Sequence, residues 1–293
     1  MVLYLQYNLK NFSMKNMLVL SNFTEASETA AKYAYVLARK LNISQVTLCH
    51  TYESILVAVS YASAFVEEDP VIQNKESLEQ LGKLNERIND LLPANVAVNY
   101  CAVNGRLPDA LAEVLNERQV DIVVMGAPRS KGILHTLFGD GSERAAKESH
   151  CPVLIVPTNA AIMPVENIVF ACNLKEMADT VPVRQLKLLL SQLNVPLSVV
   201  YITRDSSEVP IEASGNSSSI HATLADFNPQ YHHINNKSVV RGITEFAIKL
   251  NHPLIVTISK KHGPLYRFLH SSITNNLVQN STVPVMIFHD HDR

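Results

Sequence analysis

A segment in the second half of this 293-residue chain combines basic side chains with hydroxyl groups in a spacing that could bind an anion. A loop there carries four basic or imidazole side chains: Lys260, Lys261, His262 and Arg267. Three hydroxyl-bearing residues begin the helix expected after it: Ser271, Ser272 and Thr274. Ammonium groups, hydroxyls and the N–H groups of a helix N-terminus all favour a bound phosphate or carboxylate. The pattern therefore predicts an anion site, and the alternative is a solvated basic loop.

Other residues that commonly carry chemistry form no recognisable centre in the sequence. The dinucleotide-binding G-x-G-x-x-G, the phosphate-binding G-x-x-x-x-G-K-[ST] and the G-x-S-x-G turn of hydrolases do not occur. His232 and His233 are adjacent on an expected strand, so their side chains should point to opposite faces and not share a metal ion. His50 ends another expected strand and is interpreted as a structural residue. We therefore expect no catalytic residue and no metal site.

Strands and helices alternate along the first half. Short apolar runs predict strands at Met17–Leu20, Gln45–His50, Val96–Val103, Ile122–Met125 and Val153–Val156. Apolar residues at helical spacing predict helices over Glu25–Leu41, Lys75–Leu92, Pro108–Glu117 and Gly141–Glu148. Continuous apolar strands that alternate with helices are typical of a parallel sheet covered on both faces. The pattern therefore predicts a doubly wound α/β domain.

The second half repeats this order of elements. Residues 121–157 align with residues 253–289 without a gap, at an offset of 132, and residues 17–23 match residues 168–174. The polar segment 204–219 is predicted to be a loop in place of a helix. We expect a leader and two domains with about five parallel strands each, at residues 1–16, 17–158 and 166–293. The end strands Val153–Val156 and Val285–Phe288 could pair within the chain, which would cover two open sheet edges.

Composition limits the class of protein. Hydrophobic residues make up 47% and charged residues 18% of the chain, so each half can bury a core. A net charge of -2, without a long basic run, argues against nucleic acid and membrane surfaces as partners. No apolar run approaches the 18 residues or so of a membrane-spanning helix. The four cysteines (Cys49, Cys101, Cys151 and Cys172) form no C-x-x-C pair. Reduced, structural thiols and a cytoplasmic location are expected.

Three segments resemble the universal stress protein family, and with the order of elements the resemblance covers nearly the whole chain, twice. The family's first strand is followed by Thr-Asp-Phe-Ser-Glu, and the matching residues here are Ser21-Asn22-Phe23-Thr24-Glu25. A Val-Met-Gly strand end is matched by Val124-Met125-Gly126, and a closing Cys-Pro-Val-Leu strand by Cys151-Pro152-Val153-Leu154. The resemblance implies a Rossmann-like fold of the adenine nucleotide alpha-hydrolase type, and a role in the stress response.

ATP-binding members of the family carry a glycine, two residues, a second glycine, nine residues, a third glycine and then serine or threonine. The four positions read Gly126, Arg129, Gly139 and Asp140 in the first half, and Ile258, Lys261, Ser271 and Ser272 in the second. An aspartate that helps to hold the nucleoside is replaced by Asn22 and by Asn173. The resemblance thus implies a partly retained nucleotide site in the first half, with these residues: Ser21, Asn22, Thr51, Met125, Gly126, Arg129, Gly139, Asp140, Gly141 and Ser142.

Asp140 separates two interpretations of that site. With Glu143 three residues on, it resembles a capping box, whose carboxylate would occupy the helix N–H groups that a phosphate needs and would repel a triphosphate. Arg129, Lys131 and Ser142 favour a retained phosphate site instead. The leading hypothesis is a non-enzymatic stress-response module with degenerate nucleotide sites and an unknown protein partner. The alternatives are an ATP- or AMP-binding protein with slow or no hydrolysis, and a scaffold with both pockets closed. Homodimer formation is left open.

Overall fold

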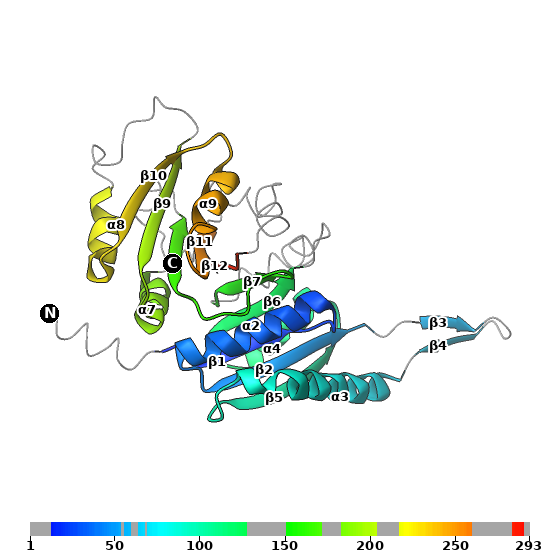
Figure 1. Ribbon diagram of the computed structural model, residues 1–293. Coiled ribbons are helices and arrows are strands. Elements are labelled where there is room, and N and C mark those ends of the chain that lie inside the picture. Colours follow the sequence, from blue (N-terminus) through cyan, green and yellow to red (C-terminus); the bar gives the residue numbers. More distant parts are fainter. Residues whose placement is uncertain are drawn as a thin grey trace.

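Ten strands form one continuous sheet in the computed structural model, which describes residues 13–53, 56–59, 64–67, 69–127, 151–171, 183–203, 217–259 and 283–289 (Figure 1). The first half contributes five strands: β1 (Asn16–Leu20), β2 (Gln45–Tyr52), β5 (Ala97–Asn104), β6 (Ile122–Ala127) and β7 (Val153–Pro157). The second half also contributes five: β8 (Asn167–Ala171), β9 (Leu197–Thr203), β10 (Gln230–Asn235), β11 (Pro253–Ser259) and β12 (Val285–His289).

The strand order is β10-β9-β8-β11-β12-β7-β6-β1-β2-β5. All neighbouring strands are parallel except β12 and β7, which are antiparallel. Each half therefore has the same order of five parallel strands. The predicted fold class is confirmed, and the two five-stranded sheets are joined into one.

Helices cover both faces of this sheet (Figure 1). One face carries α2 (Glu25–Leu41), α3 (Pro70–Ile88) with the short 3-10 turn η1 (Asn89–Leu91), α7 (Val183–Leu193), and α8 (Ser217–Leu224) with the turn η4 (Ala225–Phe227). The opposite face carries α4 (Leu107–Glu117) and α9 (Val239–Ala247). Within the described residues, no helix is long and apolar enough to cross a membrane.

Helix α2 has the predicted bounds because local signals define both of its ends. The side chain of Thr24 caps its N-terminus by accepting a hydrogen bond from the Ser27 amide, and Asn42 ends it in the left-handed conformation, with φ 51°. Its buried face includes Ala30, Ala34 and Leu37, at the helical spacing seen in the sequence.

Two elements differ from the sequence-based expectation. Helix α3 starts at Pro70, capped by the side chain of Asp69, and not at Lys75. A β-hairpin, β3 (Leu56–Val59) with β4 (Ala64–Glu67), was not predicted, and it extends away from the sheet between β2 and α3 (Figure 1). The first turn of α3 was missed because the prediction relied on apolar residues at helical spacing. Val71 and Ile72 are apolar but exposed, so they do not extend the buried stripe of the helix.

The prediction of a loop over residues 204–219 is wrong at its C-terminal end. Helix α8 begins at Ser217, and residues 204–216 lie outside the described part of the chain. Serine is favoured at helix N-termini, where its hydroxyl can bind free backbone N–H groups, so a polar run is compatible with a helix start. The second half therefore retains a helix between β9 and β10, where the first half has α3.

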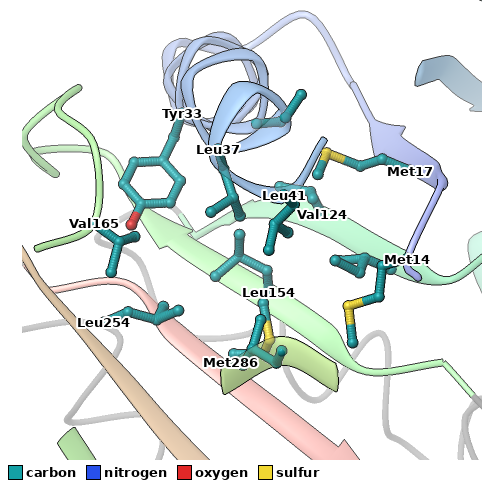
Figure 2. Close-up of a cluster of buried hydrophobic side chains, with 14 of the residues drawn as sticks. Met14, Met17, Tyr33, Leu37, Leu41, Val124, Leu154, Val165, Leu254 and Met286 are labelled. Carbon is teal, nitrogen blue, oxygen red and sulfur yellow. The ribbon is translucent and has the colours of Figure 1, made fainter. Parts of the chain in front are cut away.

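The strands β7 and β12 join the two halves at the centre of the sheet, as the sequence predicted. Leu154 pairs with Met286, and the neighbouring pairs are Val153 with Ile287 and Ile155 with Val285. Leu154 and Met286 occupy the same position in the two repeats, so the pairing is symmetric about them. Figure 2 shows how Leu154 and Met286 lie in one cluster with residues of both halves. Neither half thus has a separate core on this face.

A glutamine side chain adds a polar connection between the halves. Gln192 on α7 accepts a hydrogen bond from the backbone N–H of Met14 at 2.9 Å, and its amide group donates to the carbonyl oxygens of Met14 and Leu41. Asp121 of the first half also binds this segment: its Oδ2 accepts hydrogen bonds from the backbone N–H groups of Lys15 and Asn16, at 2.7 and 2.8 Å. The chain ahead of β1 is therefore fixed by both halves.

Two buried tyrosines of α2 allow a matched test of this packing. Burial raises the pKa of both Tyr33 and Tyr35, but only Tyr35 donates a hydrogen bond, to Asn85 Oδ1 at 2.6 Å. In the described part of the chain the Tyr33 hydroxyl makes no hydrogen bond, and Tyr33 lines a cavity of about 240 Å³. Tyr35→Phe should therefore lower the free energy of unfolding by about 1 kcal/mol, and Tyr33→Phe should leave it unchanged or raise it. Urea unfolding of both variants measures this difference, and an equal loss in both would contradict it.

Candidate functional site

A pocket opens at the carboxyl ends of β1, β2 and β6, with a volume of about 160 Å³. Its lining comes from β1, α2, β2, α4 and β6, and consists of Leu20, Ser21, Asn22, Ser27, Cys49, Thr51, Leu107, Met125 and Gly126. Strand β1 lies between β2 and β6 in the sheet. After β1 the chain adds β2 and β5 on one side and then crosses to β6 on the other, so the pocket lies where the strand order reverses. Open α/β sheets bind ligands at this point.

The turn after β1 is held in a fixed conformation at the pocket's edge. The amide of Ser21 donates to the carbonyl of Cys49 at 2.8 Å, and His50 Nδ1 makes a 2.7 Å hydrogen bond to the Ser21 carbonyl. Phe23 has the unusual left-handed φ of 61°, and its ring packs on that of His50, with 4.4 Å between ring centroids. His50 therefore has the structural role expected from the sequence, because it fixes the turn and does not line the pocket.

Asn22 presents a hydrogen-bond donor at the pocket. Its Oδ1 accepts from the backbone N–H of Thr24 at 3.3 Å and from the Thr24 hydroxyl at 2.6 Å. Both interactions use the oxygen, so within the described residues the exposed amide nitrogen has no acceptor. An aspartate here could only accept hydrogen bonds, whereas the asparagine offers two N–H groups. The replacement thus changes both the charge and the hydrogen-bonding character of the position.

Gly126 is required by the packing of α2. A Cβ atom at this position would lie 2.2 Å from the carbonyl oxygen of Ala26 and 2.7 Å from the Ser27 nitrogen. The first turn of α2 therefore rests directly on the backbone of β6. The equivalent residue of the second half is Ile258, which is buried on the face that α7 and α8 cover.

The structure brings together half of the residues that the sequence proposed for the first site. Ser21, Asn22, Thr51, Met125 and Gly126 all line this one pocket. The remaining candidates lie outside the described residues: Arg129, Gly139, Asp140, Gly141 and Ser142 in the first half, and Asn173, Lys260, Lys261, Ser271, Ser272 and Thr274 in the second.

Four lining residues were not proposed from the sequence: Leu20, Ser27, Cys49 and Leu107. Cys49 could have been found, because alternation along a strand places it on the same face as Thr51. Ser27 could also have been found, because it follows the capping Thr24 at the helix start. The nine lining residues carry no charged side chain. The described part of the pocket is therefore neutral, lined by both apolar side chains and hydroxyl or amide groups, and it suits an uncharged group.

The two histidines of β10 lie on opposite faces of the sheet, as the sequence predicted. The His232 ring packs against Phe246 of α9, at 4.6 Å between centroids, and burial lowers its pKa. His233 lies on the opposite face, where Nε2 is 3.0 Å from the hydroxyl of Thr203. Among the residues that the structure describes, no three or more metal-binding side chains gather in one place.

One family model matches most of the chain, in two segments. The model of the family described as "Universal stress protein family" matches residues 14–157 and again residues 165–289. A universal stress protein of Methanocaldococcus jannaschii is 26% identical over 153 residues, which cover 48% of this chain and 94% of that protein.

Solved structures align with both halves at once. A universal stress protein from Archaeoglobus fulgidus covers 94% of this chain and 97% of its own, with a TM-score of 0.65 and 15% identity. A protein from Pseudomonas aeruginosa covers 97% of this chain and 95% of its own, with a TM-score of 0.54 and 13% identity. At these identities the two structures support the fold alone.

Proposed function

Because this chain belongs to the universal stress protein family and carries the family's domain twice, we propose that it is a regulatory module that binds one adenine nucleotide, in its first half. The pocket at the ends of β1, β2 and β6 is the observation that supports this most strongly. The second half has the buried Ile258 in place of Gly126, so its proposed role is structural. The first half is then the part that responds to ligand.

The size and lining of the pocket fit the base of a nucleotide. A volume of about 160 Å³ is below the roughly 300 Å³ of the smallest typical ligand pockets, so it would hold one ring system and not a whole nucleotide. Leu20, Leu107 and Met125 supply apolar contact, and the hydroxyls of Ser21 and Thr51 supply polar contact. In this proposal the phosphates lie toward residues 126–142, where the family places them.

Asn22 would donate a hydrogen bond to the ligand. Its amide nitrogen is the donor that the turn leaves free, and both a ring nitrogen and a ribose oxygen can accept it. No charged side chain among the nine lining residues could act as a general base on a nearby water. We therefore propose a binding module that does not depend on ATP hydrolysis.

Calorimetric titration of the purified chain with ATP and AMP, with and without Mg²⁺, tests the proposal. The expected result is saturable binding at one site per chain. Two equivalent sites per chain would contradict the structural role of the second half. No heat at millimolar concentrations of either nucleotide, with the protein shown to be folded, would contradict nucleotide binding altogether.

Asn22→Ala is expected to weaken AMP binding roughly tenfold, because it removes one direct hydrogen bond to the ligand. Asn236→Ala is a matched control. Asn236 accepts a hydrogen bond from Ser238, the N-cap of α9, as Asn22 does from Thr24, the N-cap of α2, but it lies outside the pocket. Both variants should lose similar stability, while only Asn22→Ala loses affinity. Equal affinities in the two variants would remove Asn22 from the site.

A further inference from the structure

Cys49 of β2 and Cys101 of β5 lie directly opposite each other in the sheet. Both are buried, with 1% and 9% of their surface exposed, and both belong to the hydrophobic cluster under α4 and α9. Residues in register on neighbouring strands point to the same face, and their Cα atoms are separated by about the strand spacing of 4.7–4.9 Å. This is within the range of roughly 4.4–6.8 Å over which disulfides form. The two thiols are therefore placed for a covalent bond.

The two thiols also differ in pKa, so one of them can react with an oxidant first and the other can then attack it. A hydrogen bond from the Cys49 thiol lowers the pKa of Cys101, and the guanidinium group of Arg118 lowers it further, against the effect of burial. The same hydrogen bond, with burial, raises the pKa of Cys49. The thiolate is the nucleophilic form of cysteine, so Cys101 is the more reactive partner. It lies on β5, the edge strand of the sheet, and 9% of its surface is exposed, against 1% for Cys49.

Cys151 provides an internal contrast. Its thiol donates a hydrogen bond to the carbonyl of Val120 at 2.6 Å, and burial, with a smaller contribution from Asp121, raises its pKa to about 12. It has no cysteine in register on a neighbouring strand within the described residues. Cys151 should therefore remain a thiol under conditions that oxidise Cys101.

We propose that Cys49 and Cys101 form a reversible disulfide in the presence of hydrogen peroxide, and that this bond changes the ligand pocket. The Cys101 thiolate attacks one peroxide oxygen, the O–O bond breaks, and the released hydroxide takes up a proton to leave as water. The sulfur of Cys49 then attacks the Cys101 sulfenic acid, the S–S bond forms, and a second water leaves with the Cys49 proton. In total, two thiols are oxidised and one peroxide is reduced to two waters.

The pair lies in the half that is proposed to bind nucleotide, and Cys49 is part of the pocket wall. In the second half the equivalent pair is Val200 and His232, which cannot form a disulfide. A bond to Cys101 would draw the Cys49 sulfur toward β5 and remove its contact with a bound base. This link to ligand affinity rests on the proposed function, whereas disulfide formation itself does not.

The test of the bond uses the full chain, treated with hydrogen peroxide and then with an alkylating reagent, followed by mass spectrometry of its peptides. The expected product is a linked pair of peptides containing Cys49 and Cys101, which dithiothreitol separates. In Cys49→Ser, which lacks the resolving thiol but keeps a hydroxyl that can donate to Cys101, dimedone should label Cys101 as a sulfenic acid. The proposal is overturned if both thiols remain alkylatable in the folded wild-type chain, or if Cys151 is oxidised first.

AMP titration of reduced and oxidised protein tests the link to the pocket. Oxidation should weaken AMP binding roughly three- to tenfold, the effect of losing one small apolar contact. Cys49→Ala removes the same contact, so it should show the weaker affinity already when reduced and should not respond to peroxide. Equal affinities of the reduced and oxidised wild type would overturn the link and leave the disulfide in place. Absence of AMP binding to the reduced wild type would instead contradict the proposed function.

Discussion

Gly126→Ala is expected to lower the free energy of unfolding by about 3 kcal/mol or more, at the upper end of the cost of overpacking. The added Cβ would lie 2.2 Å from the carbonyl oxygen of Ala26, and a backbone atom cannot rotate out of the way. Helix α2 would have to move off β6, although it buries Ala30, Ala34 and Leu37 against the sheet. Urea unfolding followed by far-ultraviolet circular dichroism measures the loss.

Gly82→Ala is the matched control, because no described atom outside the adjoining part of its own helix lies within 4 Å of the position that its Cβ would take. Gly82 lies inside helix α3, where alanine is favoured over glycine by about 0.5–1 kcal/mol. Glycine-to-alanine substitution should therefore stabilise helix α3 at position 82 and destabilise the contact between α2 and β6 at position 126. If Gly126→Ala stayed within 1 kcal/mol of the wild type, α2 could not rest on β6 as described.

Much of the fold could be predicted from local pattern. Helix α2 combines apolar residues at helical spacing with a threonine cap and an asparagine end, and all three signals agree on its bounds. The pairing of β7 with β12 could be predicted from the repeat, because each half ends on an apolar strand that needs a neighbour. These features depend on residues close together in sequence, or on a symmetry that the sequence displays directly.

The missed elements lacked such signals. The first residues of α8 are serines, which alone do not distinguish a helix start from a loop. Leu224, the last residue of the helix, belongs to the core cluster that both halves share. The hairpin of β3 and β4 pairs with itself and not with the main sheet. No pattern of the repeat therefore indicated it.

In the candidate site, too, some features could be predicted from the sequence and others could not. The strand ends at Ser21, Thr51 and Gly126 could be proposed because parallel strands end at a common edge. The steric reason for Gly126 could not, because its contact with Ala26 joins residues 100 positions apart. The pairing of Cys49 with Cys101 depends on the register of β2 and β5, which the sequence does not specify. Sequence thus identified positions, and the structure supplied their contacts.

Met286→Ala is expected to cost about 3 kcal/mol and to destabilise both halves together. Met286 is fully buried opposite Leu154, in a cluster that also contains Leu37 of the first half and Leu254 of the second (Figure 2). Truncation of a buried methionine leaves a cavity and costs about 2–5 kcal/mol. The chain contains no tryptophan, so tryptophan fluorescence cannot follow its unfolding. Hydrogen exchange with mass spectrometry can instead follow the two halves separately.

Protection in β1 and β6 should fall as much as protection in β8 and β11, because one sheet and one core cluster connect them. Met163→Ala is the control: Met163 is 46% exposed, and its truncation should change stability by less than about 0.5 kcal/mol. A loss of protection confined to the second half would mean that the halves unfold independently. A joint loss would mean that the strand pair at the centre makes the tandem one cooperative unit, in which ligand bound to the first half also stabilises the second.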